Sequence, residues 1–252
     1  MTKERIRAHV KASFGRVFAE AKARPLRVLW WWIFRAIFVY GLVRHIKTNE
    51  LEGTGFTDML QIMAHMTCCF LWEFFQFLPR KHIFRWLPAY TQDVSCVYAV
   101  ATCGGKIWNL YFKYHWWDSF MHALGGLLIV LAAYELLVAL ERRDNTELPR
   151  VVRVLFPVGL AFFAGTLWEV YEFFFDQITN GNTQDWTFET KPQIFGVLDR
   201  EEDLLRRERY GLIDTMTDII MNSAGAILGA VQLRLLPYHH RAGRGAAHKK
   251  TV

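Results

Sequence analysis

The sequence predicts an all-α membrane protein, a polytopic bundle of about six transmembrane helices with an amphipathic helix at the N-terminus. Long apolar runs recur along the 252 residues, and about 20 consecutive apolar residues cross a bilayer as a helix. The chain is 52% hydrophobic and 15% aromatic, yet its Lys and Arg residues gather between the runs. That alternation is typical of a multi-span membrane protein.

The apolar runs locate the expected spans. The first run contains three consecutive tryptophans, which predict an aromatic belt at the membrane interface. The third run is the weakest, because Lys106 and Asn109 interrupt it. The expected spans are residues 26–43, 56–78, 94–112, 117–140, 151–175 and 212–236.

The chain divides into three parts. Residues 1–25 are basic, with apolar residues at helical spacing, and predict a cytoplasmic amphipathic helix that ends at Pro25. This helix either lies on an anionic membrane surface or packs on the cytoplasmic side of the protein itself. Residues 26–236 form the membrane domain, whose long outer loop at 176–211 has the ion-pair spacing of a short solvated helix at 199–209. Residues 237–252 form a basic cytoplasmic tail.

The Lys and Arg residues are divided unequally between the two sides of the expected bundle. With the N-terminus inside, the cytoplasmic segments hold 20 of them and the outer segments hold 8. Cytoplasmic loops carry such an excess, so we expect both termini in the cytoplasm. Topology therefore explains the net charge of +6, and we expect membrane lipid, not nucleic acid, as a partner.

The fifth expected span carries three carboxylates at its outer end. Glu169, Glu172 and Asp176 are spaced i, i+3, i+7, so a helix brings them to one face. An ionised carboxylate in hydrocarbon costs at least about 2.5 kcal/mol. These three side chains must therefore face protein, water or a cation.

Two other spans bring polar residues to a similar depth. Asp118 and His122 lie one helical turn apart at the outer end of the fourth span. Asp214, Asp218 and Asn222 follow one face of the sixth span at i, i+4, i+8. Because the fourth and sixth spans begin on the side where the fifth ends, we expect all three polar stripes to meet in the outer half of the membrane.

The combined residues indicate an ion site. Helical bundles hold metals with inward Glu, Asp and His residues at i, i+3 or i, i+4, so a divalent metal ion is a candidate cofactor, with His122, Glu169 and Asp218 as candidate ligands. Purely structural roles compete with this interpretation. Asp118 and Asp214 stand near helix starts, where they would serve as N-caps, and a lone His122 would be a hydrogen-bonded core histidine.

Three motifs in chain order carry a family resemblance. They are Trp117-Asp118-x3-His122-x2-Gly125, then Leu167-Trp168-Glu169-x2-Glu172-Phe173, then Gly211-Leu212-x-Asp214-Thr215-Met216-x-Asp218 followed by Gly225-Ala226. Over about residues 105–232 the chain resembles the YjdF-like family of uncharacterised bacterial inner-membrane proteins and, more distantly, VanZ-like proteins. The resemblance implies a multi-pass protein of the bacterial inner (plasma) membrane, and it implies no reaction.

The first half of the chain repeats part of the fifth-span motif. Leu71-Trp72-Glu73-x2-Gln76-Phe77 matches the pattern of Leu167-Trp168-Glu169-x2-Glu172-Phe173. With three spans in each half, the halves would be inverted repeats, as in many transporters. Glu73 would then belong to a second site near the inner face. The alternative is a chance recurrence of Leu-Trp-Glu in an aromatic-rich chain.

We expect an integral membrane protein whose buried acidic site near the outer face binds a cation or protons and a small or lipid-linked substrate, in a transporter-like or binding role. The sequence contains no visible nucleophile–base pair or phosphate loop. One alternative is a metal-dependent intramembrane hydrolase or transferase, with Glu169 or His122 as the base. The other is a non-catalytic subunit of a membrane complex, whose carboxylates form interhelical hydrogen bonds beside membrane-protein partners.

Overall fold

The computed structural model describes residues 3–48, 54–79, 82–108, 110–114, 116–179, 183–184 and 210–235. Within these ranges every regular element is a helix, which confirms the all-α class. The expected short helix at 199–209 and the tail at 237–252 lie outside the described residues. The elements are α1 (Lys3–Ala23), α2 (Pro25–Lys47), α3 (Thr54–Cys68), α4 (Leu71–Phe77), the short 3-10 helix η1 (Ile83–Trp86), α5 (Ala89–Ile107), α6 (Leu110–Lys113), α7 (Trp117–Asp144), α8 (Arg150–Thr179) and α10 (Tyr210–Leu235).

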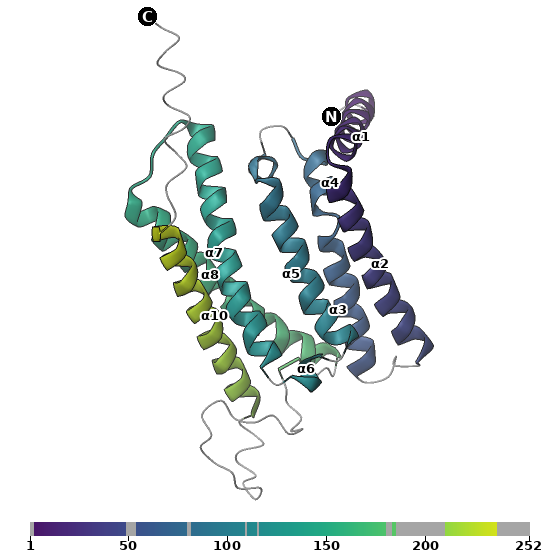
Figure 1. The fold of residues 1–252 in the computed structure, drawn as a ribbon, viewed down its shortest axis with the longest axis vertical. Coiled ribbons are helices and arrows are strands. Elements are labelled where there is room, and N and C mark those ends of the chain that lie inside the picture. The colour runs from purple at the N-terminus through teal and green to yellow at the C-terminus, as the bar shows by residue number, and fades with distance from the viewer. Residues whose placement is uncertain are drawn as a thin grey trace, which may run out of the picture.

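The helices form two groups that lie side by side (Figure 1). α7, α8 and α10 pack closely on one another, and α2, α3, α4 and α5 form the second group, with α1 at one end of it. α5 and η1 link the two groups through contacts with α7. The start of α1 and the end of α10 lie at the same end of the molecule, whereas α7 and α10 begin at the opposite end (Figure 1).

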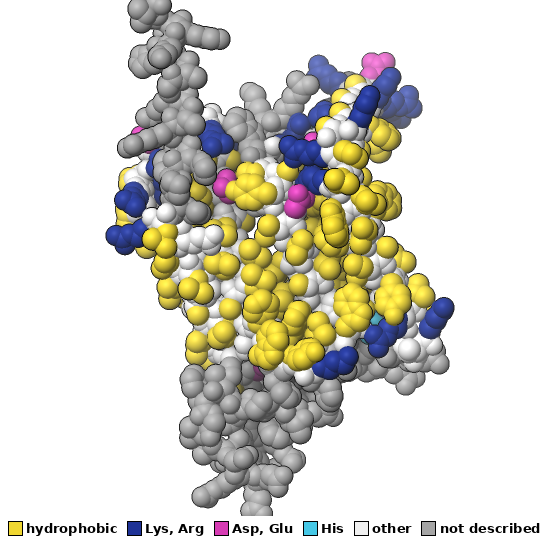
Figure 2. Space-filling view, viewed as in Figure 1, with side chains coloured by type: hydrophobic (Ala, Val, Ile, Leu, Met, Phe, Trp, Pro, Cys, Tyr) yellow, Lys and Arg dark blue, Asp and Glu magenta, His cyan; other side chains and the backbone are white. Residues whose placement is uncertain are grey.

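The helices that match the expected spans carry an apolar surface. Among the described residues four helices have the length and hydropathy of membrane spans, namely α2, α7, α8 and the Gly211–Leu235 part of α10. Figure 2 shows a broad band of hydrophobic side chains across the middle of the molecule, with Lys and Arg gathered mainly near the α1 end. Phe163 and Leu228 are among the large apolar side chains exposed to the surroundings. A surface of this kind fits contact with lipid.

The expected second span, residues 56–78, is split into α3 and α4. The break lies at Cys69 and Phe70, whose N–H groups bond to carbonyls three residues back, a tighter turn than an α-helix makes. Arg35 of α2 donates to the Cys69 carbonyl oxygen at 2.8 Å. This bond satisfies an acceptor that the break would otherwise leave open in a buried place.

The expected third span is displaced toward the N-terminus. α5 covers Ala89–Ile107 and not residues 94–112, because it begins directly after Pro88 and ends at Trp108. Just before that end, Gly105 lies against the rings of Tyr111 and Trp117, where a Cβ atom would collide with both side chains. The glycine therefore lets the chain fold closely between α5 and α7.

Glycine also permits the close approach of α7 and α10. A Cβ atom on Gly225 would collide with the backbone of Ala123, and one on Gly126 would collide with the backbone of Asn222. Small residues at helix interfaces in membranes allow this kind of backbone contact. The two helices consequently bring their first turns, which carry the polar residues, to the same end of the molecule.

α1 is held to the bundle along one face only. The Nε2 atom of His9 lies 2.7 Å from the Phe77 carbonyl oxygen, and the Arg16 guanidinium donates to the Gln76 carbonyl oxygen. The opposite face leaves apolar side chains open, with Phe18 72% exposed. α1 thus has one face that bonds to the bundle and another with exposed apolar side chains, while Phe14 and Val17 also pack against the protein.

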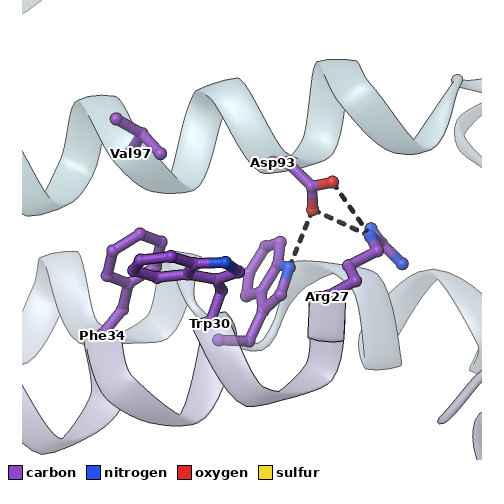
Figure 3. A pocket seen from close by; sticks show the side chains of 6 residues that line it. Arg27, Trp30, Phe34, Asp93 and Val97 are labelled. Atoms are coloured by element: carbon purple, nitrogen blue, oxygen red, sulfur yellow. Dashed lines mark hydrogen bonds and ion pairs between the residues drawn. The ribbon is translucent and has the colours of Figure 1, made fainter. Parts of the chain in front are cut away.

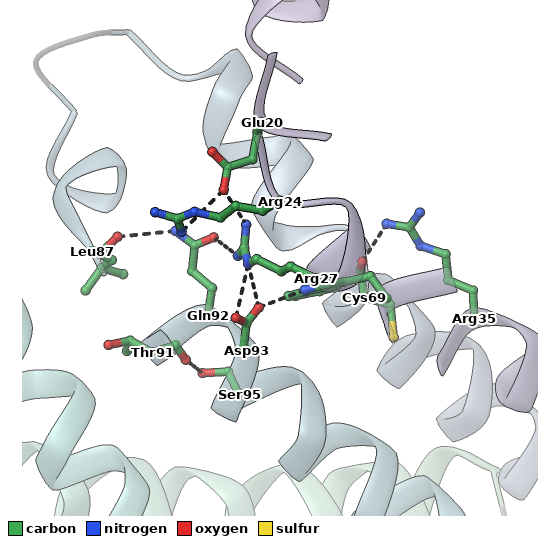
Figure 4. Close-up of polar contacts among 11 residues, drawn as sticks. Glu20, Arg24, Arg27, Arg35, Cys69, Leu87, Thr91, Gln92, Asp93 and Ser95 are labelled. Carbon is green, nitrogen blue, oxygen red and sulfur yellow. Dashed lines mark hydrogen bonds and ion pairs between the residues drawn. The ribbon is translucent and has the colours of Figure 1, made fainter. Parts of the chain in front are cut away.

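Arg27 joins α1, α2 and α5. It donates to Asp93 at 2.9 Å and to Glu20 at 3.0 Å, and Trp31 Nε1 donates to the same Asp93 carboxylate at 2.8 Å (Figure 4). Trp30 helps to line a pocket beside this ion pair, between α2 and α5 (Figure 3). In these contacts the charged and polar side chains pair with one another. They fix the α1 end of the group formed by α2, α3, α4 and α5.

Candidate functional site

The three predicted polar stripes meet at the end of the molecule opposite α1. α7 supplies Asp118 and His122 from its first turns, α8 supplies Glu169 from its last turns, and α10 supplies Asp218. The close packing of α7 against α10 places their first turns beside the end of α8. We call Asp118, His122, Glu169, Glu172, Asp214 and Asp218 the acidic-His cluster.

His122 lies at the centre of this cluster. Its Nε2 atom is 3.7 Å from Asp118 Oδ1 and 3.5 Å from Asp218 Oδ2. Its Nδ1 atom, on the other side of the ring, is 3.7 Å from Glu169 Oε1. One imidazole therefore faces carboxylates from α7, α8 and α10, with two of them at one nitrogen and one at the other.

Glu169 and Asp218, the two carboxylates that lie well inside apolar stretches of the sequence, are also deeply buried in the structure. Asp218 is 2% exposed and Glu169 is 5% exposed. The Glu169 Oε2 atom is buried without a hydrogen-bond partner among the described residues. A buried polar atom without a partner is costly, and such atoms are where a bound ion or water is to be sought.

Three residues of the cluster have metal-ligand spacing. One ligand atom each from Asp118, His122 and Asp218 lies within 4.8 Å of the others. The sequence placed His122, Glu169 and Asp218 in the candidate metal set. The structure puts Glu169 at the opposite ring nitrogen of His122 and puts Asp118 beside Asp218. Helical periodicity could not distinguish these two arrangements, because both carboxylates face the same histidine.

Glu172 and Asp214 border the centre of the cluster. Glu172 is buried and accepts a hydrogen bond from Trp168 Nε1 at 2.9 Å. Asp214 is half-buried in the second turn of α10, and its carboxyl group lies near enough to repel ionised Glu169 and Asp218. Both residues add negative potential to the site without lying among its closest contacts.

Asp176 binds the turn that follows α8. Its carboxylate accepts hydrogen bonds from the N–H and hydroxyl of Thr183, at 2.9 and 2.6 Å, and from the Gln184 N–H at 2.9 Å. It therefore ties the turn at 183–184 to the end of α8. Gln184 then donates to Thr215 Oγ1 at 3.0 Å and to the Glu169 carbonyl oxygen at 3.3 Å, which joins α8 to α10 beside the cluster.

Asn222 also serves the packing of the helices. Its Nδ2 atom donates to the Ala161 carbonyl oxygen of α8 at 3.1 Å, and its amide lies against Gly165, where a Cβ atom would collide with it. A buried amide that bonds across two helices accounts for a polar residue at this depth. Asn222 lies one turn beyond Asp218 on α10 and holds α10 against α8 next to the cluster.

Lys106 is a functional candidate that the sequence pattern marks only as an interruption of the third expected span. Its Nζ atom lies 5.3 Å from the centre of the Tyr111 ring, and its positive charge acts on Glu172. Its position inside an apolar helix was the signal that could have identified it. With Lys106 and Gln184 added, α5 and the turn after α8 also border the site.

Glu73 does not belong to the acidic-His cluster. It forms an ion pair with Arg35 of α2, and α4 lies near the α1 end of the molecule (Figure 1). The repeated Leu-Trp-Glu motifs thus lie toward opposite ends, on helices that run in opposite directions. The half-buried Glu73 is matched by an arginine of the chain, while the buried Glu169 lies among further carboxylates.

Comparison with known proteins identifies one family. Residues 80–237 match the family described as "Predicted membrane protein (DUF2238)". The matched region runs from before η1 to beyond the end of α10, so it contains every residue of the acidic-His cluster. No curated protein and no solved structure matches the chain.

Proposed function

Because the chain belongs to the DUF2238 family of predicted membrane proteins, we propose that the acidic-His cluster is an intramembrane site for a cation or for protons. In this proposal the site serves a small or lipid-linked substrate in a transporter-like or binding role. The observation that carries it is the burial of Glu169 and Asp218 around His122, with Glu169 Oε2 unbonded among the described residues.

The charges around Asp218 support a ligand of positive charge. The carboxyl groups of Asp118, Asp214, Glu169 and Glu172 lie near enough to repel an ionised Asp218, and like charges a few ångströms apart resist joint ionisation. Lys106 acts on Glu172 from α5, and His122 is the imidazole of the cluster. A bound cation or shared protons would relieve the repulsion that remains.

The Arg35–Glu73 pair offers a comparison within the same chain. There a glutamate near the α1 end is paired with a buried arginine of the neighbouring helix. That arrangement is the usual one for ionisable groups inside membranes. Glu169 instead faces a histidine that two aspartates already approach, which supports a site that takes its counter-charge from outside the chain.

Two alternatives keep specific support. The histidine with three nearby carboxylates suits a metal-dependent intramembrane hydrolase or transferase, in which an ion activates water. The interhelical bond of Asn222 and the turn contacts of Asp176 suit a subunit of a membrane complex, in which the polar groups only join helices. A partner protein that co-purifies in fixed proportion would favour the subunit.

The location of the site follows from the charge distribution of the sequence and is part of the proposal. We place both termini in the cytoplasm of a bacterium, the bundle in its inner membrane and the acidic-His cluster near the outer face. The narrower resemblance to YjdF-like and VanZ-like proteins is consistent with this location.

Amide substitutions test the proposed site. Glu169→Gln and Asp218→Asn keep the shape and hydrogen bonding of the side chains, so we expect normal insertion and abundance with loss of rescue in a deletion strain. Asp144→Asn is the matched control, because Asp144 is an exposed acid at the other end of α7 that pairs with Arg143. Full rescue by both amide variants of the cluster would remove the support for a functional site.

A further inference from the structure

The two ring nitrogens of His122 have different surroundings. Nε2 faces two carboxylate oxygens, from Asp118 at 3.7 Å and from Asp218 at 3.5 Å. Nδ1 faces one, from Glu169 at 3.7 Å. In proteins, a metal-bound histidine typically gives its other N–H to a carboxylate, which fixes the ring and its tautomer. The two sides of His122 have the residues of that arrangement.

The atoms on the Nε2 side have the spacing of a tetrahedral metal site. Zinc binds nitrogen at about 2.0–2.1 Å and carboxylate oxygen at about 2.0–2.2 Å, so tetrahedral ligand atoms lie about 3.3–3.6 Å apart. The distances from His122 Nε2 to Asp218 and to Asp118 are 3.5 and 3.7 Å. These two distances lie within a few tenths of an ångström of the tetrahedral values, and the ligand atoms of all three side chains lie within 4.8 Å of one another.

The Nδ1 side provides an independent observation. Glu169 is only 5% exposed, and its Oε2 atom has no hydrogen-bond partner among the described residues. A metal at Nε2 requires the proton of the neutral ring to be at Nδ1, where Glu169 can accept it. The buried carboxylate is therefore positioned to orient the ligand and to compensate the charge of the ion.

The ligand types distinguish among cations. One imidazole with carboxylates suits divalent transition metals such as zinc or manganese. Calcium takes six to eight oxygen ligands, and magnesium keeps several waters in an all-oxygen octahedron. Three protein ligands also leave a coordination position for water or substrate, as in catalytic zinc sites.

We propose that the acidic-His cluster binds one divalent transition metal ion through Asp118, His122 Nε2 and Asp218, with Glu169 holding His122 Nδ1 from outside the coordination sphere. This inference rests on the proposed cation site and names its ligand. The two aspartates balance the two charges of the ion.

The test uses the full chain, purified in detergent, stripped with a chelator and titrated with zinc against a competing indicator dye. We expect one ion per chain. His122→Gln, Asp118→Asn and Asp218→Asn should each weaken binding by more than about 100-fold. Glu169→Gln should weaken it by about 10- to 100-fold, the range measured for outer-sphere partners. Asp144→Asn, an exposed position at the far end of α7, should bind as the unaltered chain does.

X-ray absorption at the zinc edge provides the second measurement. We expect nitrogen and oxygen ligands with one imidazole and no sulfur, although the chain has four free cysteines. Sulfur in the first shell, equal affinity in all variants, or no binding of zinc, manganese or cobalt would overturn the metal assignment. If Glu169→Gln cost as much as Asp118→Asn, the outer-sphere role of Glu169 would be wrong.

The two proposals fail in different ways. If no metal binds while Glu169→Gln and Asp218→Asn still abolish rescue in the deletion strain, the metal inference is overturned and the cluster binds protons or another cation. If metal binds as expected while both amide variants rescue fully, the proposed functional role fails and the metal has only a structural role.

Discussion

His122 Nε2 of α7 lies 3.5 Å from Asp218 Oδ2 of α10, and this contact joins the first and last helices of the C-terminal group. Both side chains are well covered by protein. Asp218 also experiences the charges of four neighbouring carboxylates. If this cluster is the proposed binding site, its buried carboxyl groups lower the stability of the ligand-free chain, as groups at functional sites often do.

Asp218→Asn should therefore raise the stability of the ligand-free chain. The amide removes a buried charge whose desolvation costs several kcal/mol, so we expect a gain of about 1 kcal/mol or more. Glu141→Gln should instead cost about 3–5 kcal/mol, because it leaves the charge of Arg153 without its buried partner. Thermal unfolding in detergent after chelation measures both. Equal losses in the two variants would contradict a repulsive site at Asp218.

The packing of α7 on α10 predicts a second stability difference. Gly225→Ala should cost about 1–3 kcal/mol, because the new Cβ atom meets the backbone of Ala123 and the helices must separate. Gly159→Ala on α8 is the control, since nothing lies within 4 Å of its added Cβ atom. It should gain about 0.5–1 kcal/mol from helix propensity. The unfolding midpoints of the two variants should move in opposite directions.

Much of the fold could be predicted because apolar length is a local property of the sequence. α2, α7, α8 and α10 coincide with expected spans. The division of the second span into α3 and α4 is not local, because Arg35 of another helix bonds the Cys69 carbonyl at the break. The spacing of apolar residues along the chain cannot predict that contact between two helices.

In the candidate site, too, local spacing predicted which residues share a helix face, but not the contacts between helices. Helical spacing predicted that Asp118 and His122 share one helix face. The expected topology predicted that Glu169 and Asp218 lie at the same depth as these two residues. Spacing could not tell which ring nitrogen each carboxylate faces, so Asp118 was absent from the expected metal set.

The contacts of Gln184 and Asp176 show why the turn beside the site could not be predicted. Asp176 continues the polar stripe of α8, but its oxygens bond to the turn that contains Gln184. Periodicity along a helix gives no information about a residue that returns from the following segment. The contact between Gln184 and Thr215 of α10 likewise depends on how that segment folds.

Membrane orientation is testable from the two ends of α7. In a chain without its native cysteines, we expect Thr146→Cys to react only with a reagent added from the cytoplasmic side. Tyr114→Cys should react only with a reagent added outside, because the two residues flank α7 at its opposite ends. Both positions are exposed. The reverse pattern would invert the topology, and labelling of both from one side would exclude a spanning α7.

The open face of α1 predicts contact with an anionic membrane surface. Phe18 is 72% exposed on a helix that carries basic residues, and such helices bury their apolar face at the lipid boundary. An environment-sensitive dye at Phe18→Cys, in the cysteine-free chain, should report a more apolar surrounding in anionic than in zwitterionic nanodiscs. A dye at Ser13→Cys, on the buried face of α1, should report no difference. An identical response at both positions would contradict insertion.

Arg35 and Glu73 test whether the helix break depends on a buried ion pair. Removing one partner leaves an unpaired charge in the bundle, so Arg35→Leu or Glu73→Leu alone should each cost about 3–5 kcal/mol. Arg35→Leu should cost the more, because this guanidinium also bonds the Cys69 carbonyl oxygen at the break. The double variant should recover a large part of the loss, since no buried charge remains. Unfolding of the two single variants and the double variant forms a thermodynamic cycle. Additive losses would show that Arg35 and Glu73 contribute nothing as a pair.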